Sequence, residues 1–316
     1  MTTLHKTLLG FGLWVTALSA LAQWPNDRPI ELLVGFAAGG GQDVMARTMQ
    51  PFLEKALSAK IVVVNRPGAS GELAYTALAQ AKPDGYTFAL ISTPGFLTMQ
   101  ISRKVKFESK SIKPLARLVV DPSVLVVPTA SPFKQLGDVV AFAKLNPRRV
   151  SLGGSGLGTD EHFTAIQLKS TAAAEVTYVP FAGGAEAYTS LLGGHITMVG
   201  SSISGLASAS GVKPVAQLSD KRHPLLPAVP TARELGVDIV LGSERGMAIH
   251  ADVPVEIRRR FEVAIKATLD DPVFQAKAQS LNLPFAFLTG DEWAKWLDNR
   301  KQLYQAMWNT EPWIKQ

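Results

Sequence analysis

Short apolar runs typical of buried strands alternate with amphipathic helical segments along most of this chain, and the alternation starts afresh near residue 133. Buried strands that alternate with helices are typical of parallel sheets with helices on both faces. The length of 316 residues exceeds that of one ordinary domain and is enough for two, each with its own core. The sequence therefore predicts an α/β protein of two domains.

The expected elements form the two series and a helical C-terminal part. In the first series we expect strands at residues 30–36, 61–64, 86–91, 115–120 and 124–127, with a helix at 42–57 and a turn at Asp121-Pro122. In the second we expect helices at 133–144, 159–169 and 185–192, with strands at 150–152, 175–179 and 196–199. A helix begins at Pro254, Asp271-Pro272 interrupts it, and another begins near Thr289. We interpret the aromatic stripe that follows as packing, because its spacing is helical.

The first residues have the pattern of a secretory signal peptide. Lys6 supplies a positive charge, residues 8–20 are mostly apolar, and Ala20-Leu21-Ala22 has the small-x-small form of a cleavage site. A membrane anchor is the alternative, but the run is shorter than the roughly 20 apolar residues that a span needs. We therefore expect residues 1–22 to be removed and the mature protein to begin at Gln23 in the periplasm.

The chain contains no cysteine, so neither a disulfide nor a lipid-modified cysteine is expected. The formal net charge of +6 is compatible with nucleic acid, acidic lipid or small anions as partners. The two basic clusters, Arg148-Arg149 and Arg258-Arg259-Arg260, are not interleaved with aromatic residues that could stack on bases. We interpret them as a turn and a solvated helix face, and we expect no nucleic-acid partner.

Two glycine-rich segments each lie between a predicted strand and a predicted helix. They are Phe36-Ala37-Ala38-Gly39-Gly40-Gly41-Gln42-Asp43 and Gly153-Gly154-Ser155-Gly156-Leu157-Gly158-Thr159-Asp160. Such segments offer backbone N–H groups at a helix N-terminus, where the dipole favours an anion. One alone is often only a turn, but one in each series indicates a ligand held from both sides. A side chain added at Gly40 or Gly156 is expected to obstruct that ligand without disturbing a core.

Polar residues in these segments have alternative roles. Asp43 and Asp160 could contact the ligand or cap their helices, and capping is favoured because a carboxylate beside a bound carboxylate costs energy. Thr159 could do either. His162 could be catalytic, although a polar pocket or helix-surface role is favoured.

Catalytic and metal-binding motifs are missing from the sequence. Neither glycine-rich segment fits G-x-G-x-x-G or the phosphate-binding G-x-x-x-x-G-K-[ST], and Ser155 does not stand in G-x-S-x-G. The histidines show no metal-ligand spacing. We therefore expect no enzyme activity, no metal and no cofactor. A secreted hydrolase using Ser155 and His162 is the alternative of another class.

In order along the chain, the sequence resembles the Bug-type extracytoplasmic solute receptors, the substrate-binding proteins of tripartite tricarboxylate transporters. The resemblance is carried by Trp24-Pro25, Arg28-Pro29-Ile30, residues 36–43, Ala46-Arg47, Val64-Asn65-Arg66-Pro67-Gly68-Ala69-Ser70-Gly71, Lys82-Pro83-Asp84-Gly85-Tyr86-Thr87, Gly156-Leu157-Gly158-Thr159, Val179-Pro180-Phe181-Ala182-Gly183-Gly184-Ala185, Leu191-Leu192-Gly193-Gly194 and Leu226-Pro227-Ala228-Val229-Pro230-Thr231. Ser243-Glu244-Arg245-Gly246 resembles a stretch seen in some members.

The resemblance implies a type II periplasmic-binding-protein fold, with two lobes that close like a Venus flytrap about two hinge strands. We place the first lobe at residues 23–121 and 243–316, and the second at 122–242. The resemblance also implies that residues 36–43 and 155–160 hold a ligand carboxylate, partly through waters. Further pocket residues are expected to be Ser92, Thr93, His162, Phe181, Gly183 and Ser201.

Three departures from the family pattern fall at this pocket. Gly35 replaces a frequent Pro, Gln42 replaces the usual Ser or Thr, and Gly200-Ser201-Ser202 stands where many members have an acidic or amide residue. They affect the identity of the ligand more than the fold. The resemblance implies a monomer that delivers a small carboxylate to the permease subunits of a tripartite tricarboxylate-type transporter. A sensory receptor for a membrane kinase is the alternative.

Overall fold

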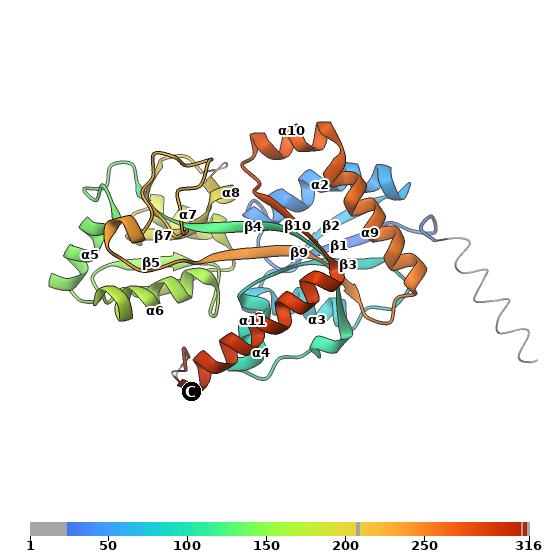
Figure 1. Cartoon of the computed structure of the whole chain (residues 1–316), viewed down its shortest axis with the longest axis horizontal. Helices are drawn as coiled ribbons and strands as arrows, with labels where there is room; N and C mark the ends of the chain where they lie inside the picture. Colours follow the sequence, from blue (N-terminus) through green and yellow to red (C-terminus); the bar gives the residue numbers. More distant parts are fainter. Residues whose placement is uncertain (1–23, 207–208, 311, 315–316) are drawn as a thin grey trace, which may run out of the picture.

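The computed structural model describes residues 24–206, 209–310 and 312–314. Figure 1 shows two α/β lobes side by side, connected by the long strands β4 (Ile112–Pro128) and β9 (Gly242–His250). The predicted signal peptide lies outside the described residues. Within the described ranges, no helix is both long and apolar enough to cross a membrane.

The sheet of the first lobe is built on β1 (Ile30–Val34), which pairs in parallel with β2 (Ile61–Asn65) and β3 (Thr87–Ser92). Strand β9 then pairs antiparallel with both β3 and β4, and β10 (Phe285–Thr289) pairs antiparallel with β4. Helices α2 (Gly41–Leu57), α3 (Glu72–Ala79), α4 (Gly95–Ser102), α9 (Val255–Asp270), α10 (Pro272–Ser280) and α11 (Gly290–Thr310) belong to this lobe. The C-terminal part of the chain thus completes the lobe that the N-terminal part begins.

The sheet of the second lobe has β5 (Ser151–Gly154) between its parallel neighbours β6 (Thr177–Pro180) and β7 (Met198–Ser202). Strands β7 and β8 (Val212–Gln217) pair antiparallel with the second half of β4. Helices α5 (Leu136–Leu145), α6 (Asp160–Ala172), α7 (Gly184–Leu192) and the short α8 (Ile203–Leu206) complete this lobe. The parallel pairing that the sequence predicted is therefore confirmed for β1, β2 and β3 and for β5, β6 and β7, whereas the pairs that involve β4, β8, β9 and β10 are antiparallel.

Strand β4 passes through Asp121 and Pro122, where the sequence predicted a turn. Its residues up to Pro122 pair with β9, whereas those from Ser123 onward pair with β7 and β8. Proline cannot donate a backbone hydrogen bond, and here it stands where the strand exchanges one set of partners for another. The proline thus marks a change of neighbour and not a reversal of the chain.

The apolar residues separate in the same way. Two buried clusters, which include Phe88, Phe261 and Trp293, pack on the sheet of the first lobe. Two others, which include Leu152 and Val199, pack on that of the second. This separation supports the lobe boundaries near Asp121 and Gly242. That the lobes move relative to each other about these points stays a prediction. Trp293 lies fully buried in the first-lobe core, as the packing interpretation of the aromatic stripe expects.

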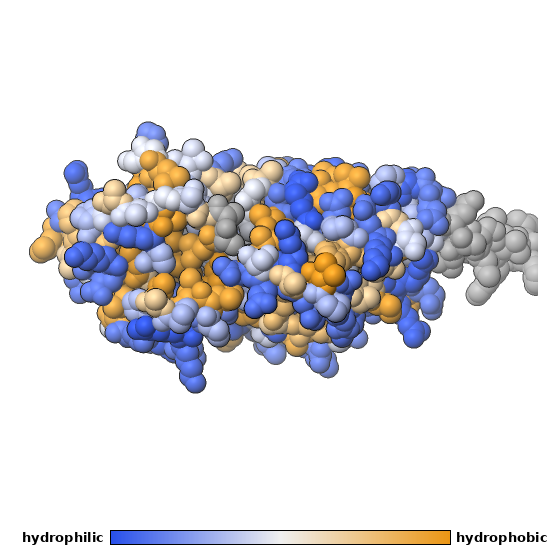
Figure 2. Space-filling model, turned by 90° about the horizontal axis from the view of Figure 1, so that it is seen from above, coloured by the Kyte–Doolittle hydropathy of each residue, from blue (hydrophilic) through white to orange (hydrophobic). Residues whose placement is uncertain are grey.

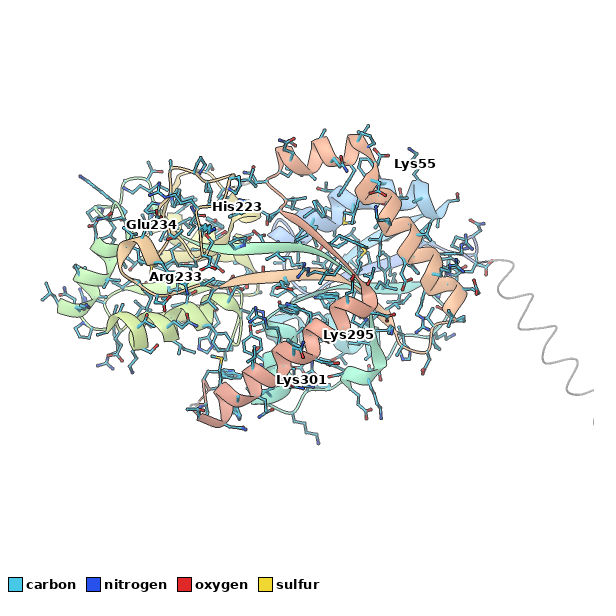
Figure 3. All side chains as sticks on the ribbon, in the orientation of Figure 1. Lys55, His223, Arg233, Glu234, Lys295 and Lys301 are labelled. Atoms are coloured by element: carbon cyan, nitrogen blue, oxygen red, sulfur yellow. The ribbon has the colours of Figure 1, made fainter. Side chains whose placement is uncertain are left out.

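The outer surface is mixed in polarity. On the face shown in Figure 2, hydrophobic residues lie in several separate groups among hydrophilic ones, as is usual for a folded surface. Figure 3 shows Lys55 on α2 and Lys295 and Lys301 on α11 at separate places on the outside of the first lobe. These basic side chains are therefore not gathered at one place.

Candidate functional site

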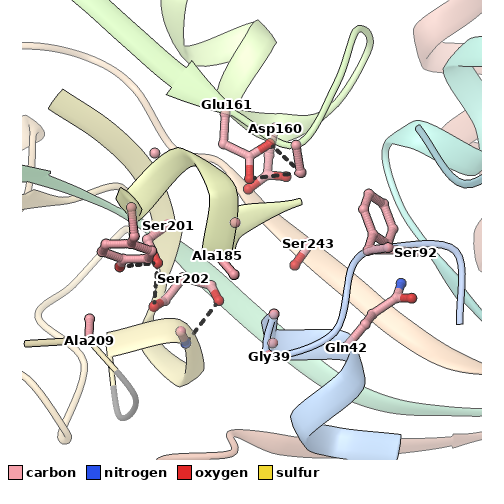
Figure 4. Close-up of a pocket in the computed structure, with 18 of the residues that line it drawn as sticks. Gly39, Gln42, Ser92, Asp160, Glu161, Ala185, Ser201, Ser202, Ala209 and Ser243 are labelled. Carbon is pink, nitrogen blue, oxygen red and sulfur yellow. Dashed lines mark hydrogen bonds between the residues drawn. The ribbon is translucent and has the colours of Figure 1, made fainter. Parts of the chain in front are cut away.

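A cavity of about 300 Å³ lies between the two lobes, at the starts of α2 and α6. Figure 4 shows polar side chains from both lobes around it. Its lining includes Phe36, Gly39, Gly40, Gly41, Gln42, Ser92, Ser243 and Arg245 from the first lobe and Ser155, Asp160, Glu161, Gly184, Ala185, Tyr188, Ser201 and Ser202 from the second. This volume is at the lower end of the range of about 300–1,000 Å³ for ligand pockets, so it suits a small ligand.

The first glycine-rich segment brings the N-terminus of α2 to the cavity wall. The helix begins at Gly41. The N-cap residue Gly40 has no side chain that could accept hydrogen bonds from the first N–H groups of the helix. First-turn N–H groups have no acceptor within their own helix, so this end of α2 can receive an anion. Asp43 does not line the cavity.

The Asp43 carboxylate instead holds the first glycine-rich segment in place through hydrogen bonds within the protein. It accepts hydrogen bonds from the Gly39 N–H at 3.0 Å, from Arg47 Nε at 3.0 Å and from Asn65 Nδ2 at 2.9 Å. Burial alone would raise the pKa of Asp43, but these bonds outweigh it and leave the pKa lowered. The geometry is that of a residue that fixes the loop.

Arg245, on β9, brings a buried positive charge to the same corner. Its guanidinium forms an ion pair with Asp121 at 3.0 Å and donates to the hydroxyls of Ser202, Ser204 and Ser243 at 3.1 Å each. A Cβ atom at Gly41 would lie 3.3 Å from Arg245 Nη1. The α2 N-terminus and the guanidinium therefore form one electropositive corner, although Asp121 balances the formal charge of Arg245.

The start of α6 brings two carboxyl groups to the cavity, Asp160 and Glu161. Asp160 accepts a hydrogen bond from the Ser123 hydroxyl, and Glu161 accepts from Ser155 Oγ at 3.2 Å. Burial, and next the negative charge of Glu161, raise the pKa of Asp160 to about 8. The two glycine-rich segments thus present different chemistry, because the second carries its own acidic groups.

Backbone N–H groups of the second glycine-rich segment form hydrogen bonds within the protein. The Gly156 N–H donates to the Tyr178 hydroxyl at 3.3 Å, and the Gly158 N–H donates to His162 Nδ1 at 3.1 Å. Burial lowers the pKa of His162 to about 4, so the ring is neutral at physiological pH. The second segment therefore has fewer free N–H donors than the first, and its role in holding the carboxylate stays a prediction.

The same segment is attached to the first lobe. The Ser70 hydroxyl donates to the Leu157 carbonyl at 2.8 Å, and the Thr98 hydroxyl donates to the Gly158 carbonyl at 2.7 Å. Gly156 has a φ of +126°, and a Cβ there would lie 2.4 Å from Ser70 Oγ. A side chain at Gly156 would therefore strain the backbone and displace Ser70 where the lobes meet, although neither residue belongs to a hydrophobic core cluster.

Gln42 and Ser92 form another part of the wall. Gln42 is 5% exposed, and neither its amide nitrogen nor its amide oxygen has a hydrogen-bond partner of acceptable geometry. The amide nevertheless lies near enough to the buried Tyr75 hydroxyl to oppose slightly the rise that burial causes in the Tyr75 pKa. Both amide atoms have almost no accessible area, so other atoms of Gln42 border the cavity in this conformation.

The structure brings together many, but not all, of the residues predicted for the site. Phe36, Gly39, Gly40, Gly41, Gln42, Ser92, Ser155, Asp160 and Ser201 line the cavity, and the Tyr188 hydroxyl donates to Ser201 Oγ at 2.8 Å. Ala37, Ala38, Asp43, Thr93, Gly156, Leu157, Gly158, Thr159, His162, Phe181 and Gly183 are not part of this lining. The Thr159 hydroxyl donates to the Gly156 carbonyl at 2.9 Å and does not cap α6.

Sequence reasoning missed Glu161, Tyr188, Ser202, Ser243 and Arg245 as lining residues. Arg245 had a detectable signal, since it is a lone cation in the otherwise uncharged run that follows Glu244. Glu161, Tyr188, Ser202 and Ser243 have no comparable signal in the sequence.

Among the described residues no hydrogen bond joins Ser155 to His162, the pair that the alternative hydrolase would use. Ser155 Oγ donates to Glu161, while His162 Nδ1 is engaged by the Gly158 N–H. In the part of the chain that the structure describes, no three His, Asp or Glu side chains are grouped to hold a metal ion.

Two lobes, two connecting strands and a polar cavity between them define the class of periplasmic binding proteins. The structure of the periplasmic binding protein BugD is similar, with a TM-score of 0.84, 25% identity and coverage of 92% of this chain and 99% of that one. A protein of R. palustris solved with adipate has a TM-score of 0.81 and 25% identity, covering 91% and 96% of the two chains.

The sequence comparisons name the family. The model of the tripartite tricarboxylate transporter family receptor matches residues 45–300. Protein BugT of Bordetella pertussis is 32% identical over 218 residues, which are 66% of each chain. The chain belongs to this family of receptors.

Proposed function

We propose that this protein captures a small carboxylate between its two lobes in the periplasm and delivers it to the membrane permease of a tripartite tricarboxylate-type transporter. The family supports the role of a solute receptor. A similar protein was solved with adipate, a dicarboxylate, which supports the ligand class.

The observation that carries the proposal is the electropositive corner at the start of α2. Uncapped N–H groups at Gly41 and Gln42 and the guanidinium of Arg245 converge on one side of the cavity. A helix N-terminus and a guanidinium both favour a carboxylate, and their hydrogen bonds to one are charge-assisted. Because the corner lies in a buried cleft, water screens it less than it would at the surface.

Binding without chemical conversion is part of this proposal. The serine and histidine that a hydrolase would need are held by other partners, namely Glu161 and the Gly158 N–H. The export of the chain rests on the sequence of residues 1–22 and on the family.

Mass spectrometry of small molecules released from purified native protein by denaturation tests the function. We expect a carboxylate in stoichiometric amount, and calorimetric titration of the stripped protein with that compound should restore binding. A stoichiometric ligand without a carboxylate, or hydrolysis of the compound during titration, would contradict the proposal. Pull-down with the loaded protein should capture permease subunits, whereas capture of a membrane kinase would replace the transport role by sensing.

A further inference from the structure

Two acidic side chains face the cavity that is proposed to bind a carboxylate. Asp160 is 6% exposed and Glu161 is 9% exposed, and both belong to the first turn of α6. Figure 4 shows their carboxyl groups directed into the cavity opposite the start of α2, where Gly39 and Gln42 lie. The charge around the cavity is therefore distributed asymmetrically. The first lobe contributes an electropositive corner, and the second lobe contributes an acidic corner formed by Asp160 and Glu161.

As far as the structure describes the chain, the acidic corner forms no ion pair, although the charge of Arg245 lies near enough to oppose the rise that burial causes in the pKa of Asp160. Among the ion pairs of the described residues, none includes Asp160 or Glu161, whereas the buried Asp121 is paired with Arg245. Their hydrogen-bond donors include the neutral hydroxyls of Ser123 and Ser155. Burying carboxylates without a counter-charge is costly, and the raised pKa of Asp160 reflects that cost. A cation that entered the cavity beside these carboxyl groups would offset this cost.

Gln42 places a further polar side chain across the cavity from the acidic corner. It lines the same cavity from α2, is nine-tenths buried, and leaves both atoms of its amide unpaired. A buried amide costs free energy unless it finds partners, and a rotation of this side chain toward the cavity would bring its amide within reach of a ligand. A ligand with several hydrogen-bonding atoms can satisfy it, whereas an alkyl chain cannot.

We propose that the ligand carries a protonated amine in addition to its carboxylate, with the carboxylate at Gly41 and Arg245 and the amine against Asp160 and Glu161. This inference rests on the proposed function and narrows its ligand class. The two groups of the ligand bind to different lobes, so a ligand with both bridges the cleft. A second carboxylate in place of the amine would be repelled by Glu161.

The experiment compares ligands that differ only at the end away from the carboxylate. Stripped protein is titrated by calorimetry with 5-aminopentanoate, glutarate and pentanoate, and with the corresponding compounds of four and six carbons. We expect the best aminocarboxylate to bind at least about tenfold more tightly than the dicarboxylate and monocarboxylate of equal length, which is about 1.4 kcal/mol.

Variants show whether the acidic corner causes this preference. Glu161→Gln keeps the shape and the contact to Ser155, so we expect it to abolish the tenfold preference, and Asp160→Asn should reduce it in the same direction. Glu175→Gln removes one exposed negative charge from the second lobe outside the cavity lining and should keep the preference. Melting curves establish that each variant is folded.

The outcomes separate this inference from the function on which it rests. Tightest binding of a dicarboxylate or plain monocarboxylate, or an unchanged amine preference in both Glu161→Gln and Asp160→Asn, would overturn the inference and leave a carboxylate receptor. Failure of every carboxylate in the three series to bind, together with a released native ligand that has no carboxylate, would overturn both.

Discussion

The Arg245 guanidinium lies directly against the first residue of α2, so that a Cβ atom at Gly41 would stand 3.3 Å from Arg245 Nη1. These residues are far apart in the sequence, and β9 and α2 bring them to one side of the cavity. Asp121 and three serine hydroxyls fix the guanidinium, so it has little room to withdraw. Glycine at this position thus keeps the helix end and the cation together.

A methyl group at that contact should weaken ligand binding. We expect Gly41→Ala to lower affinity by about tenfold, because the Cβ lies where the guanidinium and a carboxylate must approach the helix end, and one lost charge-assisted bond is worth about 1.5–3 kcal/mol. Calorimetric titration measures it. Gly137→Ala, at the start of α5 where a Cβ meets nothing closer than 3.7 Å, is the control. Equal affinity of Gly41→Ala and the parent would place the carboxylate elsewhere.

The raised pKa of Asp160 predicts how stability depends on pH. In the unfolded chain this carboxyl ionises near its ordinary value of 3.8, whereas in the folded protein it stays protonated up to about 8. The unfolded state therefore binds fewer protons between these values, so Asp160 makes the ligand-free protein less stable as the pH rises from 4 to 8.

Replacing Asp160 by Asn removes this titration and retains an acceptor for the Ser123 hydroxyl. We expect Asp160→Asn to be more stable than the parent at pH 8 by at least about 1 kcal/mol, with the difference shrinking toward pH 4. Urea unfolding of ligand-free protein across this range measures it. A difference that does not depend on pH would show that Asp160 is ionised in the folded state.

The hydrogen bonds between the lobes predict the kinetics of ligand release. Thr98→Val and Ser70→Ala each remove a bond to the second glycine-rich segment, to Gly158 and Leu157 respectively. Because one such bond is worth about 0.5–1.5 kcal/mol, we expect ligand release to accelerate severalfold in each variant. Stopped-flow displacement measures the rate, and small-angle scattering should show a larger average radius of gyration at subsaturating ligand. Thr171→Val, which removes an exposed bond within α6, should change neither.

Local signals in the sequence were sufficient for much of this architecture and insufficient for part of the site. The start of α2 follows from its glycines, and the interruption before α10 follows from Asp271-Pro272, since both depend on backbone chemistry near the residue itself. The family resemblance implied a hinge strand near Gly242, but the local pattern did not predict β9, because Ser243, Glu244 and Arg245 are polar and pairing with β3 and β4 decides their conformation. Arg245 belongs to the site through that long-range pairing, which no local pattern encodes.

Gln42 provides a test in which stability and binding should change in opposite directions. Its buried amide forms no hydrogen bond of good geometry within the protein, so we expect it to cost the empty protein free energy that a bound ligand can recover. Gln42→Met has nearly the same length without the polar atoms. We expect it to raise the unfolding free energy of the ligand-free protein by about 1 kcal/mol and to weaken ligand binding severalfold.

Gln50 is the matched control on the same helix, because its side-chain amide donates to the Ile61 carbonyl at 2.8 Å. Gln50→Met should lower the unfolding free energy by about 1 kcal/mol and leave ligand affinity unchanged, since it breaks a formed bond outside the cavity. Urea unfolding and calorimetric titration of both variants give the two quantities. If Gln42→Met is destabilised like Gln50→Met, the Gln42 amide is already satisfied within the protein, and its presence at the cavity wall is not evidence for a polar ligand.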